Sequence, residues 1–112
     1  MARYFLTLPD PTVARGAEPS LSFTAQSADV FASELEAALR TTTLFERWRD
    51  LQPDPEAIDV TLGAVDEKAT VSGNQSSLSI DLEVDTELPG SIVRSRMRWL
   101  AGSNWQLRDV RN

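Results

Sequence analysis

The chain has 112 residues, a formal net charge of −6, and neither cysteine nor histidine. It therefore lacks disulfides, thiolate nucleophiles, zinc ribbons, the usual general base at neutral pH and the commonest metal ligand. The length and the 41% of apolar residues predict one globular domain over residues 1–112, and the negative charge disfavours nucleic acid as a partner.

The N-terminal half begins with two predicted strands and one long helix. Apolar and polar side chains alternate over residues 3–8 and again over 20–25, which is typical of strands. Over residues 27–40 the apolar side chains recur at helical spacing, with Ser27 as the N-cap. The sequence therefore predicts a hairpin with a long loop, followed by a helix.

A second, short helix is predicted over residues 43–51. Thr43 and Glu46 match a capping box, in which each of the two side chains bonds the backbone amide of the other residue. Pro53 and Pro55 end this helix, because proline cannot continue the helical hydrogen-bond pattern.

In the C-terminal half, apolar and polar side chains alternate in several short segments, as is typical of strands. Residues 58–65 predict a third strand, and residues 69–72 predict a short edge strand. An acidic strand follows over residues 77–85, then an arginine-bearing strand over 92–100, and a final strand over 105–110.

The acidic and the arginine-bearing strands are predicted to form a hairpin about Pro89-Gly90. Directly opposed side chains of antiparallel strands lie about 5 Å apart, where opposite charges attract. The predicted charge pairs are Asp85 with Arg94, Glu83 with Arg96 and Asp81 with Arg98, and on the apolar face Leu82 meets Met97 and Ile80 meets Trp99.

The arginine-bearing segment also admits a helical interpretation. Ser91 is a suitable N-cap, and Val93, Met97 and Leu100 would form the apolar face of a helix. The neighbouring strand signals and the charge register favour the strand, and the helix stays open as an alternative.

These elements predict an α+β fold with an antiparallel β-sheet of five to six strands, packed on one face by one long and one short helix. Most helical residues lie in one block, about 27–51, between two strand-rich blocks. This order excludes an alternating parallel architecture.

Six side chains are candidates for binding a partner or a ligand: Arg94, Arg96, Arg98, Trp48, Trp99 and Trp105. The arginines could track phosphates and the tryptophans could stack on bases, but alternation places Trp99 on the face opposite the arginines. The acidic strand beside them would repel a polyanion, so nucleic acid is not the expected partner.

The same tryptophans could instead line a pocket between the helices and the sheet for a small apolar ligand. No metal or cofactor is predicted, because Asp81, Glu83 and Asp85 lie nearly 7 Å apart along a strand face, too far for all three to ligate one ion. Asp54, Glu56 and Asp59 flank prolines in an acidic loop that we expect in water, whereas acid–base chemistry by paired carboxylates would require burial.

The function that these observations favour is a non-catalytic protein-interaction or assembly module, with a protein partner or a second copy bound at a free strand edge or on the charged sheet face. The alternative is a domain that binds a small apolar ligand. An enzyme is not expected, since no nucleophile has an activating base. Short apolar runs and the lack of a signal peptide predict a cytoplasmic protein without membrane contact.

Overall fold

The computed structural model describes residues 1–112 as four strands and three α-helices. The strands form one antiparallel sheet in the order β2-β3-β1-β4. The elements are β1 (Ala2–Leu8), α1 (Ala28–Arg40), α2 (Thr43–Asp50), β2 (Thr70–Ser76), β3 (Ser79–Thr86), α3 (Gly90–Ala101) and β4 (Gln106–Arg111), with short 3-10 turns η1 (Pro11–Val13), η2 (Pro55–Ala57) and η3 (Val60–Gly63).

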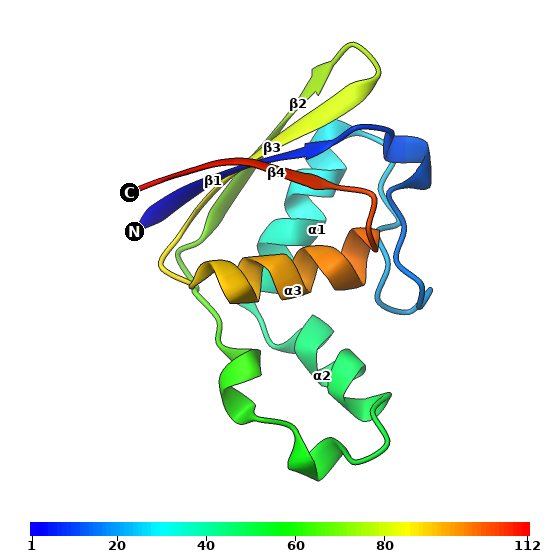
Figure 1. Cartoon of the computed structure of the whole chain (residues 1–112), viewed down its shortest axis with the longest axis vertical. Helices are drawn as coiled ribbons and strands as arrows, with labels where there is room; N and C mark the ends of the chain where they lie inside the picture. Colours follow the sequence, from blue (N-terminus) through cyan, green and yellow to red (C-terminus); the bar gives the residue numbers. More distant parts are fainter.

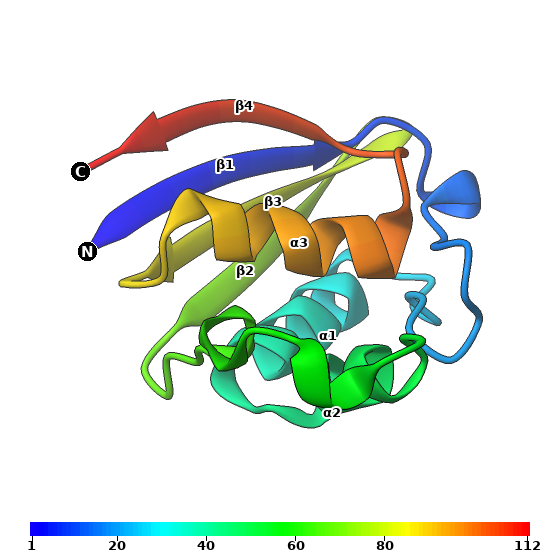
Figure 2. The same cartoon turned by 60° about the horizontal axis from the view of Figure 1, so that its bottom comes forward.

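The chain passes through the sheet as two interlocked split βαβ units, the connectivity of ferredoxin-like domains. Helix α1 joins β1 to β2 with β3 between them, and α3 joins β3 to β4 with β1 between them. Both helices cover the same face of the sheet, whereas α2, η2 and η3 form a further layer beyond them (Figure 1, Figure 2). The other face of the sheet is left uncovered (Figure 2).

The core lies between the sheet and the helices. Alternate residues of β3 are buried, and so are residues at helical spacing on α1 and α3, because each element turns one apolar side inward. The largest fully buried apolar side chains are Leu6, Leu8, Phe23, Phe31, Leu35, Leu39, Ile80, Leu82, Val84, Val93 and Met97.

Several sequence predictions are confirmed. Strands form where residues 3–8, 69–72, 77–85 and 105–110 predicted them, within a few residues at each end. Helix α1 begins after Ser27, whose side-chain oxygen accepts from the Val30 amide at 3.4 Å.

The short helix α2 is also confirmed, but its predicted capping box is wrong. The helix begins at Thr43, as predicted, but its N-cap is Thr42 rather than Thr43, and no side chain caps it.

The predicted strand over residues 20–25 is wrong. Leu21, Phe23 and Ala25 are buried as the alternation requires, but the segment packs on the helices instead of joining the sheet. The amide of Phe23 donates to the carbonyl of Leu100 at 2.9 Å, and its ring meets Phe31 edge to face with centroids 4.9 Å apart. The alternation therefore predicted correctly which side chains are buried, but the backbone of this segment bonds to the end of helix α3 and not to a strand.

The predicted strand over residues 58–65 is also wrong, because this segment forms η3 and the extended chain around it. The carboxylate of Asp59 accepts from the Thr61 amide at 2.9 Å, which starts the 3-10 turn. Gly63 lies against the ring of Phe45, so closely that a Cβ at this position would stand 2.7 Å from two ring carbons.

The predicted arginine-bearing strand is the helix α3, so the helical alternative is correct, although its N-cap is Pro89 rather than Ser91. The proposed hairpin about Pro89-Gly90 does not form. Val93, Met97 and Leu100 are buried at helical spacing. Strand β3 pairs with β1 at the edge opposite β2, and Leu6 of β1 lies opposite Leu82. The sheet therefore has four strands rather than five to six, and three helices accompany it.

Candidate functional site

The acidic side chains of β3 lie on the uncovered face of the sheet and contact polar side chains of β1. Arg3 contacts Glu83 at 3.2 Å and Asp85 at 2.8 Å, and the hydroxyl of Thr7 donates to Asp81 at 2.7 Å. The predicted pairs with Arg94, Arg96 and Arg98 are therefore wrong. No group of three or more acidic side chains is arranged to hold a metal ion.

The three candidate arginines are not brought together. Arg94 and Arg98 lie one helical turn apart and are exposed, and neither forms an ion pair with a carboxylate. Arg96 points in the opposite direction, into the protein, where its side chain is fully buried. A continuous row of cations for phosphates is thus not present on α3.

Arg96 is a buried cation that no carboxylate neutralises. Its Nη2 donates to the carbonyls of Leu62 at 2.6 Å and Ala64 at 3.4 Å, and its Nη1 donates to the hydroxyl of Ser95 at 3.0 Å. The guanidinium lies 4.7 Å from the ring centroid of Trp99. Burial lowers the pKa of Arg96 to about 10, so the group still carries its charge at neutral pH.

Two of the three candidate tryptophans meet, and they join α2 to α3. The rings of Trp48 and Trp99 stack with centroids 4.7 Å apart. They border a surface depression of about 320 Å³ that also includes Arg98 and Glu18. Trp105 lies apart, and its indole N–H donates to the carbonyl of Gly102 at 3.0 Å.

A feature with no counterpart among the six candidates is the acidic segment, residues 50–67. It contains six of the 17 acidic residues and none of the 11 basic ones. The other 11 acids and the 11 bases cancel, so this segment carries the whole net charge of −6. The six acids are Asp50, Asp54, Glu56, Asp59, Asp66 and Glu67.

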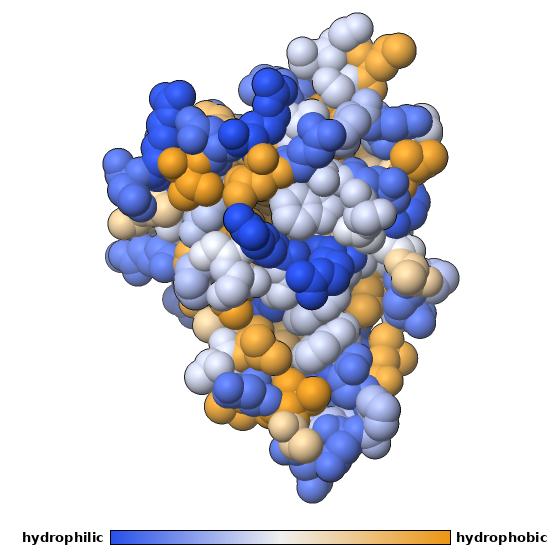
Figure 3. All heavy atoms as spheres, viewed as in Figure 1, coloured by the Kyte–Doolittle hydropathy of each residue, from blue (hydrophilic) through white to orange (hydrophobic).

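The acidic segment also exposes apolar side chains. Val60 is 79% exposed and Leu51 is 52% exposed, values that are high for residues of this kind. Figure 3 shows hydrophobic residues next to hydrophilic ones at the end of the molecule where η2 and η3 lie. The carboxylates of Asp54 and Glu56 are exposed and take part in no ion pair.

Side chains from three other elements hold the acidic segment in place. Arg96 of α3 binds two of its carbonyls, and Phe45 of α2 packs on Gly63. At its C-terminal end, Asp66 accepts from the amide of Glu87 at 3.0 Å and the hydroxyl of Thr86 at 2.9 Å. The Glu87 amide makes the largest contribution to lowering the pKa of Asp66. The segment is thus fixed although it contains only 3-10 turns.

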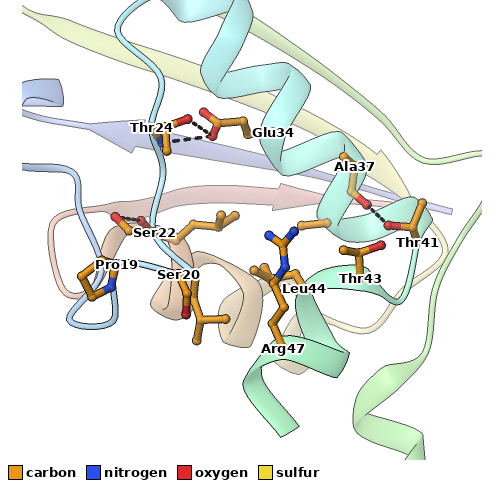
Figure 4. A pocket seen from close by; sticks show the side chains of 13 residues that line it. Pro19, Ser20, Ser22, Thr24, Glu34, Ala37, Thr41, Thr43, Leu44 and Arg47 are labelled. Atoms are coloured by element: carbon orange, nitrogen blue, oxygen red, sulfur yellow. Dashed lines mark hydrogen bonds between the residues drawn. The ribbon is translucent and has the colours of Figure 1, made fainter. Parts of the chain in front are cut away.

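A cleft lies between residues 19–24, α1 and α2, with a volume of about 300 Å³ (Figure 4). Its polar side chains include Glu34 of α1 and Arg47 of α2. The Oε1 atom of Glu34 accepts from the amide of Thr24 at 3.0 Å and from its hydroxyl at 2.8 Å. The side chain of Arg47 projects from α2 into the cleft (Figure 4).

None of the helices has the length and apolar character that crossing a membrane requires. Comparison of the chain with protein-family models, with curated proteins and with solved structures finds no match.

Proposed function

We propose that this protein is a non-catalytic protein-interaction module whose acidic segment binds a positively charged surface of a partner protein. The observation that supports this proposal is the coincidence, in residues 50–67, of the entire net charge with exposed apolar side chains. Apolar side chains exposed beside charged ones are typical of surfaces that bind other proteins.

The two kinds of side chain have different roles in the proposed complex. Val60 and Leu51 bury apolar area against the partner, at roughly 25 cal/mol per Å² before the costs of association. Asp54, Glu56 and Asp59 attract a basic surface over about a Debye length and so raise the association rate. Two acidic segments would repel each other, which favours a different protein over a second copy as the partner.

Preorganisation supports the same proposal. A loop that is ordered only on binding loses affinity to the entropy of ordering, and a loop already held in position avoids that cost. Arg96 and Phe45 hold the acidic segment from outside, and its own Asp66 accepts from the backbone amide of Glu87. Because Arg96 bonds to carbonyls, its charge neutralises none of the segment's carboxylates.

The alternative of a small apolar ligand between the helices and the sheet has less support. A cluster of 23 buried residues fills that space, and Trp48 and Trp99 cover one another. Catalysis also has less support, because the side chains of Asp54, Glu56 and Asp59 are exposed and the chain has no histidine or cysteine to act as a base or a nucleophile.

The test uses two variants with the same net charge. In the first, Asp54→Asn, Glu56→Gln and Asp59→Asn remove three charges from the acidic segment. In the second, Asp10→Asn, Glu18→Gln and Asp29→Asn remove three charges from the N-terminal part of the chain. Proteins that bind the immobilised full chain in a cell extract are identified, purified and titrated against the original protein and both variants.

We expect at least one basic protein to bind the original chain and the N-terminal variant with similar affinity, and the segment variant at least tenfold more weakly, with a slower association rate. Adding Val60→Ser to the segment variant should weaken binding further. Equal affinities for the two variants, or partners that are themselves acidic, would refute the proposal.

A further inference from the structure

We propose that the cleft between residues 19–24, α1 and α2 binds a small organic monocarboxylate with an apolar body. The cleft, at about 300 Å³, is at the lower end of the size range of ligand sites. None of its lining residues belongs to the acidic segment, and the proposal is independent of the function of that segment.

The anchoring group is the guanidinium of Arg47. It points into the cleft from α2 (Figure 4), and no carboxylate of the chain lies within ion-pair distance of it. A guanidinium presents its N–H groups as a planar fork that matches the two oxygens of a carboxylate. The unpaired cation in a concave site therefore calls for an anionic group on the ligand.

The floor of the cleft requires that the rest of the ligand be apolar. Four buried apolar residues from the 19–24 segment and the three helices form it: Leu21, Ala38, Leu44 and Leu100. The hydroxyls at the rim are largely engaged within the chain, since Thr24 donates to Glu34 and Thr41 donates to the carbonyl of Ala37 at 2.9 Å. A sugar, which needs many free hydrogen-bonding partners, fits this lining poorly.

Glu34 limits the charge of the ligand to a single negative unit. Its Oε1 is fixed by the two bonds from Thr24, and its Oε2 is shielded from solvent without a hydrogen-bond partner. The carboxylate therefore stays at the wall of the cleft and repels a second negative charge on a ligand. This arrangement favours a monocarboxylate over a dicarboxylate or a phosphate.

The proposal is tested by titrating the ¹⁵N-labelled full chain with three probes and following the amide chemical shifts. The probes are phenylacetate, its neutral analogue phenylacetamide, and the dianion phenylsuccinate. Arg47→Gln removes the anchoring charge, and Arg49→Gln is the matched control, because Arg49 lies on the same helix but does not line the cleft.

We expect phenylacetate to shift the amides of residues 20–24 and 43–47, and to bind more tightly than either other probe. Arg47→Gln should weaken its binding about 10- to 100-fold, the equivalent of losing one charge-assisted interaction, and Arg49→Gln should leave it unchanged. Equal binding of phenylacetamide, an equal effect of the two arginine substitutions, or no shift with millimolar phenylacetate would overturn the proposal. None of these results would bear on the acidic segment.

Discussion

Replacing Arg96 by methionine separates the two roles that this side chain has in the structure, as part of the core and as the anchor of the acidic segment. Methionine keeps a flexible apolar stem in the same space but has no hydrogen-bond donor. Arg98, two residues further along α3, is exposed, and Arg98→Met is the matched control.

The expected change in global stability is small, because two opposing contributions nearly cancel. Burial lowers the pKa of Arg96 from its ordinary value to about 10, which corresponds to about 3 kcal/mol against the charged form. The short bond to the Leu62 carbonyl contributes about 1.5–3 kcal/mol and the contact with Trp99 about 1–2 kcal/mol in its favour. The cost of burial is present at neutral pH and is relieved only above pH 10, where the folded chain releases the proton before the unfolded chain does.

We therefore expect Arg96→Met to change the free energy of unfolding by less than about 2 kcal/mol, measured by urea denaturation. The local effect should be larger. Amides of residues 60–65 should exchange with deuterium faster in Arg96→Met than in Arg98→Met, since the carbonyls of Leu62 and Ala64 are released. A loss above about 4 kcal/mol without faster exchange in residues 60–65 would refute the assignment of Arg96 as the anchor of the acidic segment.

Three further substitutions test the packing of the fold. Gly73→Ala would place a Cβ 2.4 Å from the carbonyl oxygen of Ala28 and should cost about 1–3 kcal/mol of unfolding free energy, whereas Asn74→Ala next to it should cost less than about 0.5 kcal/mol. Ser77→Gly should stabilise the β2–β3 hairpin by about 0.5–1 kcal/mol, because Ser77 has a φ of 59° at the first position of a two-residue turn; no gain in thermal stability would count against this turn geometry. Asp66→Asn should cost about 1–2 kcal/mol at pH 7, a difference that should shrink as the pH falls through the lowered pKa of Asp66, and a pH-independent difference would contradict the stabilising role of its charge.

The sequence was sufficient to locate most elements but not to pair them. The alternation of Ile80, Leu82 and Val84 is a local pattern, and these residues are buried as it predicts. Their partner strand is β1, more than 70 residues away in the chain, and nothing in either segment specifies that pairing. The charge pattern instead favours the nearby arginine-bearing segment as the partner, whereas in the structure Arg3 of β1 supplies the positive charge.

The error at residues 92–100 has a particular cause. Arginine occurs at every second position of this segment, a pattern that predicts a strand with Arg96 on its solvent-facing side. In the helix, Arg96 falls on the same side as Val93 and Met97 and is buried with them. Arginine tolerates this position because its stem is apolar and its planar group stacks on an aromatic ring. Because a charged residue occupies a buried position of the helix, the helical spacing of the buried residues is not evident from hydrophobicity alone.

The candidate interaction surface depends on the same buried charge. The sequence identified Asp54, Glu56 and Asp59 as an acidic loop, and composition alone shows that residues 50–67 hold all the net charge. What it could not show is that an arginine far along the chain holds this loop by its carbonyls. Had the guanidinium met a carboxylate of the segment instead, the pair would have removed one unit of the charge available to a partner. In the structure the only ion pair of the segment is that of Asp50 with Arg49, at 3.9 Å, so the loop is held by a cation and still presents nearly all its negative charge to solvent.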